Sequence, residues 1–159
     1  MKLKLFFRML LCSMALLSFA ACSDDDDSLF IEDGIIAYVG DVVVDQNDGT
    51  TYTAKDVKID LTFYAVANTA EMLVKQVKFA EKMPIRLDMT VKGIDFTIAG
   101  SGITIVGNNI VPEAMGGPFP AYTIINLSGK VTDSDFSFSM KCGEFPVTFT
   151  GKAVLTSAK

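Results

Sequence analysis

Catalytic chemistry in this chain would have to come from cysteines and carboxylates, because its 159 residues include no histidine. Histidine is the side chain whose unperturbed pKa lies nearest neutrality, so histidine-based catalytic triads and most transition-metal sites are excluded. Cys142 lies in a segment of alternating apolar and polar residues, with no histidine to activate its thiol. This setting favours a small buried hydrophobe over a nucleophile.

Paired carboxylates are the remaining catalytic option, and Asp56 and Asp60 are close in sequence. On a strand, a spacing of four places both on one face about 13 Å apart. That distance exceeds the roughly 5–9.5 Å that glycosidase carboxylates require. The acidic stretch at 45–50, "DQNDGT", lacks the glycine position and closing glutamate of a calcium loop, and we interpret it as a hairpin turn. We therefore expect a non-enzymatic protein with no catalytic residues, metal site or cofactor, and a hydrolase is the least favoured class.

The N-terminal segment 1–21 has the three parts of an export signal. Lys2, Lys4 and Arg8 supply a positive start, an apolar run "MLLCSMALLSF" follows, and small residues end it. The apolar run is shorter than the roughly 20 residues that a membrane-spanning helix needs. We predict that residues 1–21 are a signal peptide and exclude them from the fold.

The end of this segment resembles a bacterial lipobox, in which the cysteine after the cleavage site carries a diacylglyceryl group. Ala20, Ala21 and Cys22 match its last three positions, whereas Phe19 stands where a leucine is usual. The resemblance implies lipid attachment at Cys22, and two or more acyl chains anchor a protein stably to a membrane. The alternative is ordinary secretory cleavage after Ala20, which would release a soluble protein.

Residues 22–33 include four consecutive aspartates, and such a like-charge run favours an extended, disordered tether. An acidic cluster directly after the lipidated cysteine also resembles that of Bacteroidetes-type surface lipoproteins. That resemblance implies an outer-membrane lipoprotein exposed on the cell surface, with a periplasm-facing protein as the alternative. The "DSL" at 27–29 resembles the O-glycosylation site of such bacteria, which would place a glycan on Ser28.

Residues 34–159 change to alternating apolar and polar positions, the pattern of strands with one buried and one wet face. About eight such segments, separated by turn signals, predict a closed antiparallel up-and-down β-barrel, with a β-sandwich as the alternative. The segment 68–83 has a mixed period, and we predict a strand with a bulge or a short helical turn. The clearest alternating segments are "DVKIDLTFYA" (56–65), "IRLDMTVK" (85–92) and "DFSFSMKC" (135–142).

The order of these segments resembles the calycin-like barrel lipoproteins of Bacteroidetes, over most of residues 34–153. The most telling parts are the "LSGKV" turn at 127–131 and the closing "FPVTFTG" at 145–151. The resemblance implies a lipocalin-like barrel of unestablished function. The chain has no tryptophan, so it lacks the glycine-x-tryptophan signature of true lipocalins.

Two functions are consistent with this fold. In the first, the barrel lumen binds a small apolar or amphipathic ligand, although the same side chains would also suit a filled core. In the second, the protein is a surface adhesin or accessory subunit whose loop 108–122 binds a protein or glycan, with Met115 and Phe119 as contact residues. A net charge of −5 argues against nucleic acid. The predicted lumen residues are Ile59, Leu61, Phe63, Leu87, Met89, Phe136, Phe138 and Met140.

Overall fold

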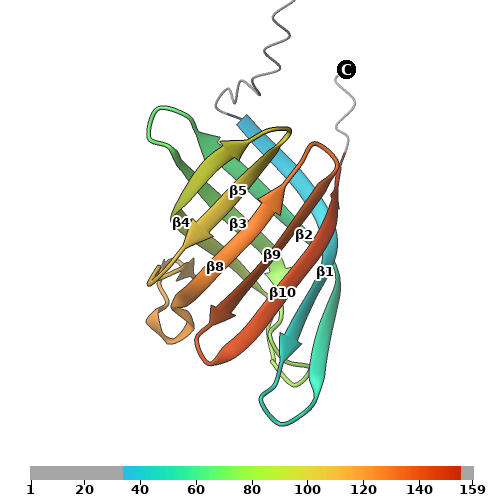
Figure 1. Ribbon diagram of the computed structural model, residues 1–159. Coiled ribbons are helices and arrows are strands. Elements are labelled where there is room, and N and C mark those ends of the chain that lie inside the picture. The colour runs from blue at the N-terminus through green and yellow to red at the C-terminus, as the bar shows by residue number, and fades with distance from the viewer. Residues whose placement is uncertain (1–33, 155–159) are drawn as a thin grey trace, which may run out of the picture.

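The computed structural model describes residues 34–154, which form an all-β closed barrel (Figure 1). The predicted signal peptide, the acidic tether, Cys22 and Ser28 lie outside the described residues. Within residues 34–154, no helix is long and apolar enough to cross a membrane. The elements are β1 (Gly34–Asp45), β2 (Thr51–Tyr64), β3 (Thr69–Val77), β4 (Leu87–Ala99), β5 (Gly102–Gly107), β6 (Glu113–Ala114), β7 (Gly117–Pro118), the 3-10 helix η1 (Pro120–Tyr122), β8 (Ile124–Val131), β9 (Asp135–Cys142) and β10 (Phe145–Ala153).

Eight long strands form the barrel wall, each antiparallel to the next one along the chain. The pairing of β1 with β10, from Tyr38 opposite Ala153 to Val44 opposite Val147, closes the ring. The short β6–β7 hairpin lies outside this ring and pairs with β4. Closure leaves none of the eight wall strands as a free edge, and the predicted up-and-down barrel is confirmed.

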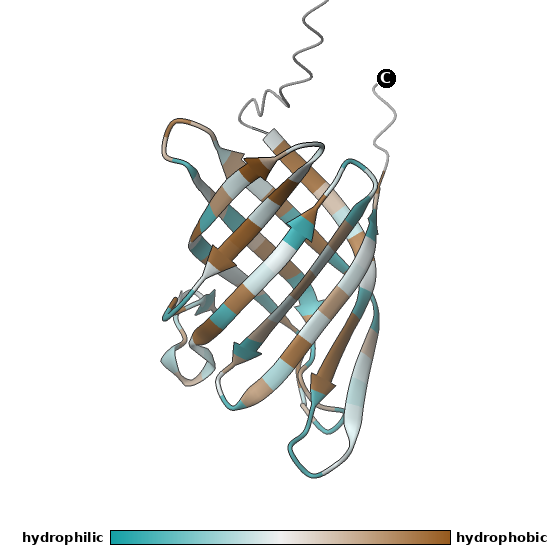
Figure 2. Ribbon diagram, in the orientation of Figure 1, coloured by the Kyte–Doolittle hydropathy of each residue, from teal (hydrophilic) through white to brown (hydrophobic). Residues whose placement is uncertain are grey.

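The alternation of side chains in the strands separates a buried interior from a wet exterior. In β2, Ile59, Leu61 and Phe63 are buried, Asp60 and Thr62 between them are half-buried, and the flanking Lys58 and Tyr64 are exposed. Figure 2 shows the same alternation as bands of opposite hydropathy along the strands. The described residues contain no buried polar or charged residue, so burial of apolar surface drives the assembly of the wall.

Bulges interrupt the alternation in four strands, β2, β3, β4 and β8. In β3, Val74 and Val77 are both buried and Gln76 between them has φ 51°, which confirms the predicted bulge in segment 68–83. In β4, Val91 and Ile94 are both buried on either side of Gly93, whose φ is 71°. The alternating pattern predicts separate strands before and after Gly93. The bulge at Gly93 joins them into the single strand β4.

The alternating segment 85–92 predicts Ile85 on the same buried face as Leu87, Met89 and Val91, and the structure places Ile85 differently. The strand begins only at Leu87, after a bend that follows Pro84, and the Ile85 side chain is 46 % exposed. The first position of the alternating run therefore belongs to the connection between β3 and β4. The expectation for Ile85 is wrong because a proline cannot donate a ladder hydrogen bond and marks the strand boundary.

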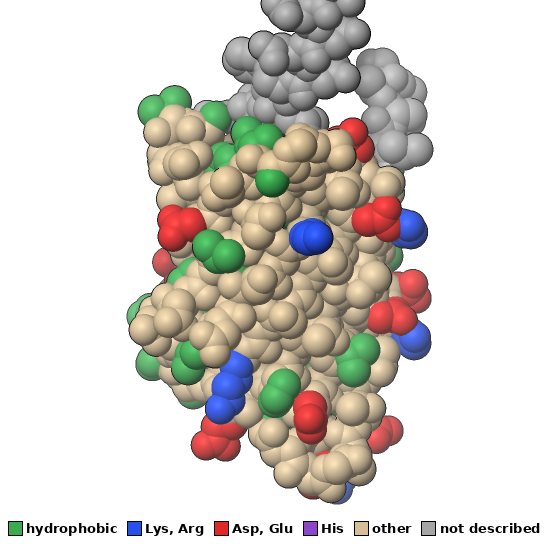
Figure 3. Space-filling view, in the orientation of Figure 1, with side chains coloured by type: hydrophobic (Ala, Val, Ile, Leu, Met, Phe, Trp, Pro, Cys, Tyr) green, Lys and Arg blue, Asp and Glu red, His purple; other side chains and the backbone are tan. Residues whose placement is uncertain are grey.

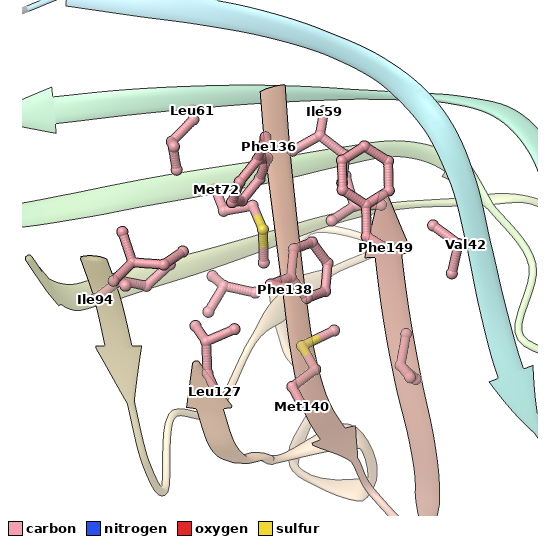
Figure 4. Close-up of a cluster of buried hydrophobic side chains, with 14 of the residues drawn as sticks. Val42, Ile59, Leu61, Met72, Ile94, Leu127, Phe136, Phe138, Met140 and Phe149 are labelled. Atoms are coloured by element: carbon pink, nitrogen blue, oxygen red, sulfur yellow. The ribbon is translucent and has the colours of Figure 1, made fainter. Parts of the chain in front are cut away.

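Aromatic rings occupy the centre of the barrel. Phe136 packs against Phe149 with ring centroids 5.5 Å apart, and Phe138 packs against both rings (Figure 4). Tyr38 adds a fourth ring, 5.1 Å from Phe136, and its hydroxyl donates a hydrogen bond to the carbonyl of Thr132 at 3.0 Å. That bond satisfies the hydroxyl of the completely buried Tyr38.

Strands β1 and β10 approach closely where two glycines face each other. Gly40 is opposite Gly151, and a Cβ on Gly40 would lie 2.1 Å from the Thr150 carbonyl oxygen and 2.4 Å from the Gly151 Cα. Backbone atoms of a closed barrel cannot move away from such a contact independently. Glycine is therefore required where the ring closes.

We expect Gly40→Ala to lower the free energy of unfolding by about 1–3 kcal/mol, the usual cost of overpacking. The matched control is Gly102→Ala, where the new Cβ would meet its nearest atom at an ordinary 3.4 Å. Urea denaturation followed by circular dichroism measures both. Equal stability of the two variants would contradict the close approach of β1 and β10.

Candidate functional site

The eight predicted lumen residues are all buried, at most 5 % exposed. Seven of them belong to one apolar cluster that reaches around the wall, whereas Leu87 is outside that cluster and lines a groove on the barrel surface. Leu61 and Met72 are partners on β2 and β3, and Figure 4 shows them in the same buried cluster as Phe136 of β9. These buried side chains form the hydrophobic core that occupies the interior of the barrel, as the narrow interior of an eight-stranded barrel allows.

A groove of about 560 Å³ opens on the outside of the barrel. It lies between the end of β3, the start of β4 and the β6–β7 hairpin, at the lower left of Figure 1. Segments 76–90 and 113–117 form it, so two distant parts of the chain meet there. The residues that line it are Gln76, Ile85, Arg86, Leu87, Asp88, Thr90, Glu113, Ala114, Met115, Gly116 and Gly117.

The β6–β7 hairpin forms one wall of the groove. Ala114 pairs with Met89 of β4 and is buried, which fixes the hairpin against the barrel. A 2.7 Å ion pair between Lys92 and Glu113 adds a second attachment. Both residues of the tight turn have positive φ, 54° at Met115 and 85° at Gly116, and the Met115 side chain is 74 % exposed.

A methionine at this turn is unfavourable on two counts. Positive φ favours glycine or asparagine, and a side chain held there costs about 1–3 kcal/mol. Exposure also leaves the apolar surface of Met115 in water. Such backbone strain is commonly found where a residue serves binding.

Polar groups form the other side of the groove. The Asp88 carboxylate accepts hydrogen bonds from the backbone N and the side-chain Nε2 of Gln76, both at 2.8 Å, and these bonds lower its pKa. The Gln76 carbonyl in turn accepts a bond from Arg86 Nη1 at 3.2 Å. Among the described residues Arg86 forms no ion pair, so the groove presents a cation available to an outside carboxylate.

The two predicted loop residues have different surroundings. Met115 lines the groove, whereas Phe119 lies outside its lining and stacks on Tyr122 with ring centroids 5.0 Å apart. Tyr122 packs in turn against Phe79, so Phe119 helps to hold the long connection on the barrel. The sequence analysis missed Arg86 and Asp88, because only the folded position of the hairpin makes them neighbours of Met115.

The cysteine and carboxylate that the sequence offers for catalysis lie on different strands, Cys142 on β9 and Asp60 on β2. Cys142 is fully buried, and burial raises the pKa of its thiol to about 12. Its thiol donates to the carbonyl of Tyr122 at 3.6 Å. Asp60 forms ion pairs with Lys58 and Lys75, and its side chain is half-buried, with an Oδ1 that is covered and accepts no hydrogen bond from the described residues. Within residues 34–154, no three Cys, Asp or Glu side chains gather in a way that would hold a metal ion.

Comparison with known proteins finds no family model that matches this chain and no similar curated protein. The class of fold therefore comes from the structure itself. The described residues form an eight-stranded, antiparallel, up-and-down barrel, an architecture compatible with a calycin-like fold.

We expect the Cys142 thiol to resist alkylation in the folded protein. The rise in its pKa from 9.0 to about 12 lowers the reactive thiolate fraction at pH 8 by about a thousandfold. Iodoacetamide labelling of the chain from Ser23 onward, in which Cys142 is the only cysteine, with and without urea, measures the difference. Rapid labelling without urea would contradict the burial of the thiol.

The same shift predicts a loss of stability at alkaline pH. The folded-state pKa of Cys142 lies above its unfolded value, so its contribution is complete below about pH 9 and is lost as pH rises towards 12. Tyr38, whose pKa burial raises from 10.0 to about 12, adds to the decline above pH 10. Urea titrations at a series of pH values measure the free energy of unfolding as a function of pH. Cys142→Ala should reduce its decline just above pH 9, and an unchanged decline would contradict this account.

Proposed function

We propose that this protein is a lipid-anchored, non-enzymatic binding protein of the outer cell surface that recognises a partner protein through the groove beside the β6–β7 hairpin. The observation that carries the proposal is the pairing of an exposed, strained Met115 with the free cation of Arg86 in one concave site. Arginine is among the residues enriched at binding hot spots. Methionine adapts its shape to varied partners.

The position of the groove supports this function. The chain enters the barrel at Gly34, at the upper end of Figure 1, and the groove lies at the opposite end. A protein anchored through Cys22 would hold its entry end towards the membrane. The groove would then face away from the membrane, where a partner has access to it.

The lining of the groove favours a protein over a glycan. It combines apolar Ile85 and Met115 with the charged Arg86, Asp88 and Glu113. An apolar anchor with a charged rim is typical of protein interfaces. The lining contains no aromatic ring, the surface on which the face of a sugar commonly packs.

The second candidate is a small apolar ligand inside the barrel. The core includes Met72, Met89 and Met140, and unbranched methionines change rotamer more readily than branched side chains do. Movement of these three side chains would open space among the rings of Phe136 and Phe138. This function requires a rearrangement of the core, whereas the groove is already open.

Photo-crosslinking from the hairpin tests the proposed site. A photoreactive residue at position 115, expressed in the host cell, should form one dominant protein adduct, because Met115 lies at the rim of the groove. The matched control is position 106, where Val106 is 45 % exposed on β5 and lies outside the groove lining. Equal adducts from both positions, or a glycan adduct at 115, would contradict the proposal.

With the partner identified, Arg86→Gln and Met115→Asn should each weaken its affinity by about tenfold or more. Met115→Asn should at the same time raise the free energy of unfolding by about 0.5–1 kcal/mol, because asparagine tolerates positive φ better than methionine does. Calorimetric titration and urea denaturation measure the two effects. A variant that lost both stability and affinity would indicate a structural role for Met115.

A further inference from the structure

Exposed apolar side chains gather at the end of the barrel where the chain enters. Five of the nine large hydrophobic residues with exposed side chains belong to this end, and we call them the tether-end rim. Figure 3 shows hydrophobic side chains along the same end of the molecule. The rim consists of Ile35, Tyr64, Val66, Ile98 and Val154.

The rim extends over neighbouring strands, from the end of β10 across β1 and β2 to β4. Ile35 of β1 lies opposite Thr62 of β2, two residues before Tyr64, and the backbone N of Val154 bonds to the carbonyl of Ala37 in β1 at 2.7 Å. Val66, at the β2–β3 turn, is 100 % exposed. Turns of this kind usually consist of polar residues and glycine, so an apolar turn needs a separate explanation.

We propose that the tether-end rim lies against the lipid bilayer and orients the barrel on the membrane. This inference rests on the proposed lipid anchor at Cys22. Only 11 residues (23–33) separate that cysteine from Gly34, so Gly34, where the chain enters this end of the barrel, lies within about 40 Å of the anchor. The short tether gives the rim a high effective concentration at the bilayer surface.

Contact with lipid removes the cost of exposing these side chains to water, at roughly 25 cal/mol per Å² of apolar surface. Tyr64 suits the boundary in particular, because tyrosine is enriched where apolar and polar layers of a membrane meet. The remaining part of the same end carries Asp133 and Asp135, of which Asp135 is paired with Lys152. We therefore infer that the β1–β2 side of this end is nearer to the lipid than the β8–β9 turn.

The absence of tryptophan from the chain allows a direct test. Tyr64→Trp and Tyr52→Trp place one reporter at each end of the same strand, about 40 Å apart. The chain from Cys22 onward is coupled through that thiol to a maleimide lipid in phosphatidylcholine vesicles with brominated acyl chains. The buried Cys142 thiol does not compete for the maleimide.

Bromine should lower the emission of Tyr64→Trp about twofold or more and leave that of Tyr52→Trp unchanged, since interfacial groups lie within about 5–10 Å of the acyl boundary. Adding Val66→Ser and Ile35→Ser to the Tyr64→Trp chain should remove the quenching. Equal thermal melts, and quenching of both reporters by acrylamide without vesicles, show that each variant is folded and its reporter accessible.

Quenching of neither reporter, or of both equally, would overturn the orientation. Emission of Tyr64→Trp that is already shifted to the blue without vesicles would also overturn it, because the tether or a second copy of the chain would then cover the rim. Chemical coupling holds the chain at the bilayer whether or not the cell lipidates Cys22. Mass spectrometry of the native protein tests that lipidation separately, so the anchor and the orientation can fail independently.

Discussion

Phe138 and Phe149 stack in the barrel centre with ring centroids 5.4 Å apart, and this contact constrains the wall around it. A Cβ on Gly151 would lie 2.4 Å from Phe149 Cζ, and a Cβ on Gly129 would lie 2.9 Å from Phe138 Cβ. The Phe149 ring therefore requires glycine at position 151 of its own strand, and the close backbone and Cβ of β9 require glycine at position 129 of β8. An eight-stranded barrel is wide enough for its own side chains or for one small ligand, and in this barrel the buried rings occupy the interior.

A filled interior places recognition on the outside of the barrel, and the two ends differ in what they offer. Short turns join the strands at the entry end, where the exposed residues are mainly apolar. Longer connections, 78–86 and 108–123, join them at the other end and form the groove with Met115 and Arg86. The entry end is thus suited to contact with a flat apolar surface. The opposite end is suited to a partner that is complementary to the groove in shape and charge.

The sequence predicts the wall well and the groove poorly, for a physical reason. Alternation in residues such as Ile59 and Leu61 reports which face of a strand is buried, and this local property decides the barrel. The groove depends on the pairing of β6 with β4, some 25 residues away, which no local pattern encodes. The positive φ of Met115 is equally hidden, although the glycines that follow it are a turn signal.

Native mass spectrometry of the protein extracted from its own membrane tests the central claim, that the barrel interior is a filled core. We predict one mass, equal to the mature chain with its covalently attached groups. An additional bound mass that organic solvent removes would contradict this account, because it would show that the lumen carries a ligand.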